Sequence, residues 1–222
     1  MPKRAVIFAN GSLPDLEPAR RLIKRNDLLI AADGGACHAL ALGLQPHILI
    51  GDLDSSPSEL QATLQEAGAH ILRYPRDKDE TDLELALTCA LEQGCSRIIV
   101  IAALGGRLDQ TIGNLALLTA PRLQALDVRV DDGVEEAFFV REQAQVQGRS
   151  GDIVSLIPWG GDVSGVSTRG LRWPLSNEHL YACQTRGISN EMLAGQVFIS
   201  IASGLLLVVH RRISVNLQKE IP

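Results

Sequence analysis

Short apolar runs alternate with segments of helical periodicity as far as about residue 120, and this alternation restricts the fold more than any other feature. The apolar runs cover residues 5–10, 28–33, 47–52, 70–75 and 97–104. The candidate helices cover residues 17–25, 36–42, 58–67, 83–93 and 111–120. Strands that alternate with helices form a mainly parallel sheet, and strands covered on both faces are apolar throughout. The sequence therefore predicts an α/β fold in this region.

The pattern changes near residue 140. Residues 141–222 show short strand-like runs, many glycine and serine residues and few windows of helical periodicity. This pattern is typical of a small antiparallel β domain, either a sandwich or a partial barrel. Residues 128–132 and 135–140 are also strand-like, and they either complete the first sheet or lead across to the second domain. We therefore expect an α/β/α domain at residues 1–140 and a β-sandwich domain at residues 141–222.

Composition and charge exclude several classes of partner. The chain has 222 residues, of which 45% are hydrophobic, so it can bury one large core or two modest ones. A formal net charge of −5 without any basic block argues against a surface for nucleic acid or anionic membranes. No apolar run is long enough for a signal peptide or a membrane span, and the four cysteines lack C-x-x-C spacing. We expect a cytoplasmic protein with reduced thiols.

Residues 77–82, DKDETD, crowd four carboxylates into one short stretch. A solvated loop with a helix N-cap would explain them, because Asp and Thr cap helices and acids favour the positive end of the helix dipole. Other apolar runs, however, also end in aspartates: Asp33, the pair Asp52 and Asp54, and Asp109. In an open α/β sheet, ligands bind beyond the carboxyl ends of the strands. The aspartates are therefore expected on one rim.

Aspartates that meet on one rim repel each other unless a cation neutralises them. Asp52 and Asp54 are two positions apart, so an extended backbone would point both side chains in the same direction. Hard oxygen ligands beside glycine turns suit Mg²⁺ that bridges the phosphates of a substrate. We therefore interpret DKDETD as one wall of a magnesium site.

The segment GGRLD, residues 105–109, supplies groups suited to anions. The adjacent residues Gly105 and Gly106 let backbone N–H groups approach a phosphate, and a helix beginning near Gln110 adds its dipole. Arg107 can make a bidentate contact to phosphate. An ordinary strand–turn–helix connection with a surface arginine would also fit this segment. It is neither a Walker loop nor a dinucleotide-binding fingerprint.

Six motifs run in order through nearly the whole chain: AADGGA (31–36), IGDLDS (50–55), KDETDLELAL (78–87), GGRLDQTIGN (105–114), GLRWPL (170–175) and TRGISNE (185–191). In combination they resemble the bacterial thiamine pyrophosphokinase family. Two positions depart from the family pattern: Gln110 stands where many members have His, and Trp173 where Tyr is frequent.

The resemblance implies a homodimeric enzyme that transfers the pyrophosphoryl group of ATP to the hydroxyl of thiamine, giving thiamine diphosphate and AMP. It implies that residues 1–140 bind ATP and Mg²⁺, that residues 141–222 bind thiamine, and that the thiamine site lies between subunits.

The resemblance also implies roles for individual residues. The expected magnesium ligands are Asp52, Asp54 and Asp82. The expected nucleotide-binding residues are Asp33, Gly34, Lys78, Thr81, Gly105, Gly106, Arg107 and Gln110. The mechanism that we expect on this basis is mainly electrostatic and is our own interpretation: the expected catalytic residues are Asp82, Asp109 and Arg107, with Arg107 stabilising charge as AMP leaves and Asp82 or Asp109 accepting the hydroxyl proton. Ser189 and Asn190 are expected to reach thiamine in the neighbouring subunit.

Two other functions are compatible with the same residues. A metal-dependent nucleotide phosphohydrolase would use the acidic rim and would release phosphate without thiamine. A non-catalytic sensor would bind thiamine or thiamine diphosphate. Loss of the rim aspartates would favour a sensor, but all of them are present in this sequence.

Overall fold

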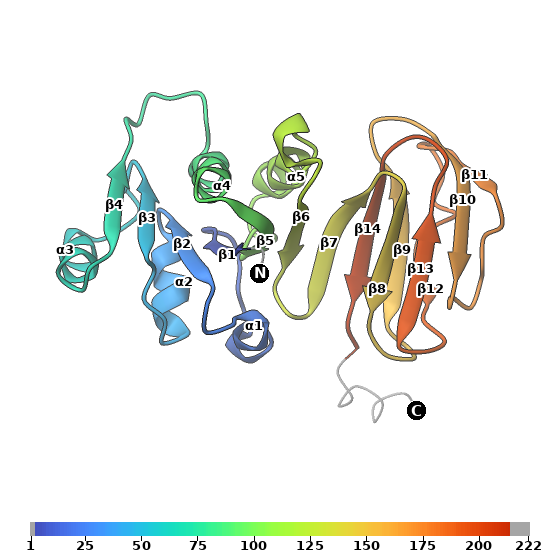
Figure 1. Ribbon diagram of the computed structural model, residues 1–222, viewed down its shortest axis with the longest axis horizontal. Coiled ribbons are helices and arrows are strands. Elements are labelled where there is room, and N and C mark those ends of the chain that lie inside the picture. The colour runs from blue at the N-terminus through green and yellow to red at the C-terminus, as the bar shows by residue number, and fades with distance from the viewer. Residues whose placement is uncertain (1–2, 214–222) are drawn as a thin grey trace. The chain divides into compact units, whose positions relative to one another are not determined.

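The chain forms two compact units that divide between Gly133 and Val134. The structure, a computed structural model, describes residues 3–213 (Figure 1). The sequence predicted a boundary after residue 140, with residues 135–140 either completing the first sheet or leading across to the second domain. In the structure these residues belong to unit 2. Within the described part of the chain, no helix is long and apolar enough to cross a membrane.

Unit 1 contains a parallel sheet whose strands follow the order β6-β5-β1-β2-β3-β4. The strands are β1 (Lys3–Phe8), β2 (Leu28–Ala32), β3 (Ile48–Gly51), β4 (His70–Arg73), β5 (Cys95–Ile101) and β6 (Asp127–Asp131). The chain first adds strands on one side of β1 and then, from β5 onwards, on the other side. The winding direction therefore reverses between β1 and β5, and an α/β sheet of this kind places its ligand crevice at that reversal.

Helices cover both faces of this sheet. They are α1 (Leu16–Leu22), α2 (Gly35–Ala41), α3 (Ser58–Glu66), α4 (Asp82–Glu92) and α5 (Leu108–Leu117), followed by the 3₁₀ turn Pro121–Leu123. Figure 1 shows α1, α2 and α3 on one face and α4 and α5 on the other, as right-handed crossovers require when the winding reverses. The predicted helices are thus found, although α5 begins at Leu108 instead of near Gln110.

Close packing of α2 against β1 fixes the turn that follows β2. A Cβ atom on Gly35 would lie 2.0 Å from the carbonyl oxygen of Phe8, so only glycine allows this approach. Phe8 is itself fully buried. The position of Asp33 at the mouth of the sheet therefore depends on a glycine two residues later.

Unit 2 is an antiparallel sandwich, and the predicted fold class is confirmed. Within unit 2, the strands of the first sheet follow the order β12-β9-β14-β7, and the second, four-stranded sheet has the order β11-β10-β13-β8. The strands are β7 (Glu135–Val140), β8 (Gln143–Gln147), β9 (Ile153–Pro158), β10 (Val163–Arg169), β11 (Glu178–Leu180), β12 (Asn190–Glu191), β13 (Gln196–Ser200) and β14 (Leu206–Arg211). Phe138, Leu156 and Val208 of the first sheet share one hydrophobic core with Val146 and Val197 of the second.

A buried polar network crosses the first sheet of unit 2. His210 is fully buried, with Nδ1 3.0 Å from Glu136 Oε1 and Nε2 3.1 Å from Asp152 Oδ2. His210 therefore links two buried acids, one on β7 and one just before β9.

The replacement His210→Leu should lower the free energy of unfolding by roughly 1–3 kcal/mol, because it removes the imidazole partner of two buried carboxylate oxygens. Urea denaturation followed by circular dichroism measures this change. The matched control is His179→Ala, which removes a half-exposed histidine 3.3 Å from Asp162 and should cost less than about 1 kcal/mol. Equal effects of the two replacements would contradict the assigned role of His210.

Candidate functional site

A crevice of about 690 Å³ lies in unit 1, where the loops after β1, β2, β3 and β5 meet the first turns of α4 and α5. It includes the winding reversal between β1 and β5, which is where the topology predicts a ligand site. The predicted site residues in its lining are Asp33, Asp52, Asp54, Lys78, Thr81, Asp82, Gly105, Gly106, Arg107 and Gln110. The structure therefore brings together residues that lie far apart in the sequence.

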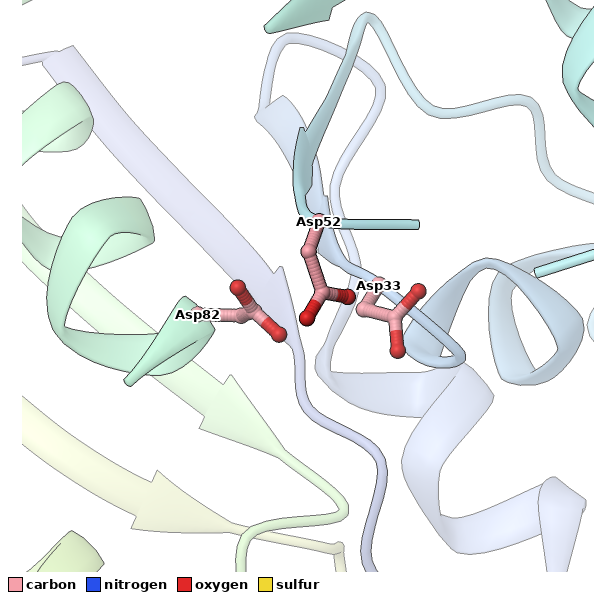
Figure 2. A group of neighbouring side chains, drawn as sticks. All are labelled: Asp33, Asp52 and Asp82. Carbon is pink, nitrogen blue, oxygen red and sulfur yellow. The ribbon is translucent and has the colours of Figure 1, made fainter. Parts of the chain in front are cut away.

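Three carboxylates form the centre of this crevice. Asp33, Asp52 and Asp82 each place one oxygen within 4.8 Å of the others, and Figure 2 shows the carboxylate of Asp52 between those of Asp33 and Asp82. Asp33 follows β2, Asp52 follows β3, and Asp82 is the first residue of α4. Asp33 is 5% exposed, and its Oδ1 has no hydrogen-bond partner among residues 3–213. A buried acceptor left open beside two other carboxylates fits a hard cation such as Mg²⁺.

Asp54 is placed differently from the sequence expectation. It lines the crevice but is not part of the three-carboxylate group, and Arg76 Nε lies 3.6 Å from its Oδ2. The expected extended backbone between Asp52 and Asp54 is wrong, because Leu53 has φ +65° and is buried, 3% exposed. The backbone N–H of Asp54 donates to Asp52 Oδ1 at 3.1 Å, which closes a tight turn.

The backbone around the carboxylates is constrained. Asp33 has φ +45°, which costs energy for a residue with a side chain and persists only where the surrounding structure imposes it. Its N–H donates to the carbonyl of Ile50 at 2.9 Å. Gly51 has φ +144°, and a Cβ there would lie 2.9 Å from Asp82 Cγ and 3.2 Å from Asp33 Cβ. The carboxylates thus approach each other because Gly51 has no side chain.

Burial raises the pKa of Asp82 above its usual value. The ammonium of Lys78 opposes this rise, and the charges of Asp52 and Asp33 add to it. The pKa of Asp82 is therefore higher in the folded protein than in the unfolded chain. Below the unfolded pKa, Asp82 costs the metal-free protein no stability. As the pH rises through the folded pKa, Asp82 ionises and the metal-free protein becomes less stable. A bound cation would remove the cost.

Arg107 and Asp109 form an exposed pair next to the crevice. Arg107 Nε donates to Asp109 Oδ1 at 3.1 Å and Nη2 to Oδ2 at 2.5 Å. These hydrogen bonds lower the pKa of Asp109 and raise that of Arg107. Asp109 is not among the lining residues, and neither is Gly34, where a Cβ would lie 2.5 Å from Asn10 Oδ1. Gly34 therefore serves packing in this structure.

Thr81 caps α4, since its hydroxyl oxygen accepts from the N–H of Glu84 at 3.2 Å. The capping reading of DKDETD is thus correct for Thr81, while Asp82 belongs to the carboxylate group. Asn10, Ser12 and Asn114 also line the crevice and were missed as site residues. Asn114 offered a signal: it is a polar residue on the buried side of α5, and its Nδ2 donates to the carbonyl of Ala103 at 2.8 Å.

Ser189 and Asn190 lie in unit 2, in a separate hollow of about 570 Å³. Trp173, 57% exposed, lines the same hollow. Asn190 Oδ1 accepts from the N–H of Trp173 at 3.1 Å, and Nδ2 donates to its carbonyl at 2.7 Å. Asn190 therefore positions Trp173. Ser189, with φ +60°, is held through its N–H, which donates to Ser155 Oγ at 3.0 Å.

The fold and the crevice together define the class of the protein: a two-unit protein whose α/β unit carries an acidic crevice at the winding reversal of its sheet. Residues 19–153 match the family described as "Thiamin pyrophosphokinase, catalytic domain", and residues 140–206 match "Thiamin pyrophosphokinase, vitamin B1 binding domain". The chain belongs to the thiamine pyrophosphokinase family.

Similar proteins cover both units. A thiamine pyrophosphokinase of Bacillus subtilis is 30% identical over 184 residues, which is 82% of this chain and 86% of the relative. The crystal structure of the Bacillus subtilis enzyme has a TM-score of 0.85 at 26% identity and covers 96% of this chain and 100% of that chain. The enzyme of Geobacillus thermodenitrificans gives a TM-score of 0.81 at 26% identity, with 96% and 99% covered.

If the three carboxylates hold Mg²⁺, the replacement Gly51→Ala should weaken its binding by about 10–100-fold, the usual cost of disturbing groups that orient metal ligands. The added Cβ would displace the carboxylate of Asp82. Isothermal titration of the nucleotide-free protein with MgCl₂ measures the affinity. Gly68→Ala is the matched control, because Gly68 also has a positive φ, +95°, but open space around its Cβ position. An unchanged Mg²⁺ affinity in Gly51→Ala would contradict this packing role.

Proposed function

We propose that this chain is a thiamine pyrophosphokinase, which transfers the pyrophosphoryl group of ATP to the hydroxyl of thiamine to give thiamine diphosphate and AMP. The observation that carries this proposal is the convergence of three carboxylates and a glycine-rich turn in one crevice, in a chain that matches both domains of the family. A phosphohydrolase or a sensor lacks a specific observation in its favour.

Asp33, Asp52 and Asp82 are the residues that we propose to hold Mg²⁺. Their hard oxygens, close spacing and one open buried acceptor fit this ion. When bound, Mg²⁺ supplies positive charge that neutralises the phosphate oxygens. Asp54 stays in the proposed set as a further carboxylate, because it lines the same crevice and its pairing with Arg76 is long and exposed.

The chemical step needs an oriented polyphosphate and an acceptor hydroxyl in line with it. We infer that Arg107 and the amides of Gly105 and Gly106 hold the phosphates, with Lys78, Thr81 and Gln110 lining the same space. The thiamine hydroxyl forms a bond to the β-phosphorus, the bond from the α-phosphate oxygen to that phosphorus breaks, and AMP leaves with the electron pair. Arg107 stabilises the charge that develops on the leaving phosphate.

The hydroxyl proton needs an acceptor, and Asp82 and Asp109 are the two proposed carboxylates. They differ in environment, because burial raises the pKa of Asp82, whereas Arg107 lowers that of Asp109.

We further propose that the enzyme works as a homodimer with shared sites. No residue that lines the crevice of unit 1 within the described chain is aromatic, so this surface has no aromatic group on which the thiamine rings could stack. The hollow of unit 2 contains Trp173, Ile188 and Ser189, which suit thiamine. The acids of one subunit would then act on thiamine bound in this hollow of the other, where Ser189 and Trp173 face the ligand and Asn190 holds Trp173 in place. The cytoplasmic location stays a prediction.

A single assay separates the possible activities. The protein is incubated with ATP and Mg²⁺, with and without thiamine, and AMP is resolved from ADP and phosphate. AMP formed only with thiamine supports the proposed function. Phosphate without thiamine would indicate a hydrolase, and binding without turnover would indicate a sensor.

The replacements Asp52→Asn and Asp54→Asn should each reduce turnover by at least about a hundredfold, because each removes a charged oxygen from the site. Folding should survive, since fewer like charges remain in contact. Steady-state rates of AMP formation measure the effect. Asp79→Asn is the matched control: it removes an exposed acid of the same DKDETD segment that does not line the crevice. Near-wild-type turnover of the double variant would rule out these ligands.

Subunit mixing tests the shared sites. One variant carries Asp54→Asn, and the other carries Ser189→Ala with Trp173→Ala, which spares the backbone hydrogen bonds of Asn190. In a heterodimer both lesions fall in one site and the second site is wild type, so activity should recover to about half of wild type per heterodimer. Demonstrated exchange without recovered activity would contradict shared sites.

A further inference from the structure

Three basic residues beside the acidic crevice are each paired with an acid nearby. These pairs are Lys78 with Asp82, Arg76 with Asp54, and Arg107 with Asp109. The side chains of Arg76 and Arg107 are 82% and 73% exposed, whereas that of Lys78 is only 11% exposed. Water and salt weaken an exposed pair, so the pair made by Lys78 has the greatest electrostatic effect.

Lys78 lies in the loop before α4, which begins at Asp82. Its Nζ is 3.0 Å from Asp82 Oδ1 and 3.3 Å from the carbonyl oxygen of Pro75, to which it donates. Asp82 belongs to the carboxylate group with Asp33 and Asp52. Among residues 3–213, Lys78 is the basic side chain that forms an ion pair with this group. Its ammonium thus stands beside the place where a metal ion would bind.

We propose that Lys78 is a tethered counter-ion of the carboxylate group. In the resting enzyme its ammonium pairs with Asp82 and so weakens the binding of free Mg²⁺. When the metal–nucleotide complex binds, the ammonium of Lys78 leaves Asp82 and pairs with the phosphates. This inference rests on the proposed function, because it takes the carboxylate group as the magnesium site. The loop tether allows the transfer, since Lys78 lines the same crevice that the polyphosphate would fill.

The exchange couples the two ligands. Free Mg²⁺ must compete with the ammonium for Asp82, and a free polyphosphate must attract Lys78 away from a carboxylate. Bound together, the metal satisfies Asp82 and the phosphates satisfy Lys78, so each ligand favours the other, and this coupling is reciprocal. The resting enzyme would therefore select the metal–nucleotide complex over either component.

The test compares four nucleotide-free proteins: wild type, Lys78→Met, Lys78→Arg and the control Lys24→Met. Lys24 is not among the residues of the crevice, and its replacement makes the same change in net charge. Isothermal titration with MgCl₂ gives the affinity, and thermal unfolding in EDTA gives the metal-free stability. We expect Lys78→Met to bind Mg²⁺ roughly five- to tenfold more tightly than wild type, at the low end of usual coupling factors. Lys78→Arg and Lys24→Met should stay near wild type.

The metal-free stability gives a second readout. Lys78→Met should unfold at a lower temperature in EDTA than wild type, because the carboxylates lose their internal cation. Saturating Mg²⁺ should restore more of that loss in Lys78→Met than in Lys24→Met. If Lys78 merely fastens the loop through Pro75, the loss would persist with Mg²⁺ and the Mg²⁺ affinity would not change.

Nucleotide coupling is measured with α,β-methylene-ATP, in which the bond that the proposed reaction breaks is blocked. In wild type, saturating Mg²⁺ should tighten binding of this analogue, and in Lys78→Met this factor should fall at least about fivefold. Equal Mg²⁺ affinity and equal coupling in all four proteins would overturn the counter-ion role and leave the proposed function intact. Absence of Mg²⁺ binding in every protein would overturn the counter-ion role together with the magnesium site.

Discussion

The mutual repulsion of Asp33, Asp52 and Asp82 is the interaction around which the rest of unit 1 is arranged. Three carboxylate oxygens within 4.8 Å of one another are unfavourable without a cation, so the surrounding structure must hold them together. The sheet holds them in place, because β2, β3 and the last four residues of β1 are apolar and almost entirely buried. The positive φ of Asp33 and the missing side chain of Gly51 add local constraint. Stability supplied by the sheet is thereby used to maintain a charged site.

The sequence predicts this convergence but not its detailed membership. Parallel strands end at one edge, so the aspartates that follow them must gather there, and Asp33, Asp52 and Asp82 do. The placement of Asp54 depends instead on Leu53, which turns with φ +65° to bury its side chain beside Leu49 and Leu64. A demand of the core overrides the two-residue period of an extended chain, and no sequence pattern announces a positive φ at leucine.

Residue roles in unit 2 were harder to predict for a different physical reason. Ser189 and Asn190 came from family resemblance, and the structure shows that the amide of Asn190 is taken up by the backbone of Trp173. The role of such a loop residue depends on hydrogen bonds to residues far away in the sequence, in this case between residues 173 and 190. Local sequence patterns do not encode these partners. Trp173 is consequently the side chain of this pair that remains exposed for contact.

The distribution of residue types over the two units bears on the competition between transfer and hydrolysis. The crevice of unit 1 carries carboxylates, a lysine, an arginine and a glycine-rich turn, so it can gather metal and phosphate, but no residue of its described lining is aromatic. Aromatic and aliphatic groups lie in the hollow of unit 2. If the polyphosphate becomes fully aligned only when thiamine is bound in the hollow of unit 2, a water molecule without thiamine meets a poorly aligned polyphosphate and reacts slowly. Separation of charge recognition from ring recognition would then favour thiamine over water as the acceptor, by the same logic through which binding energy is used for orientation.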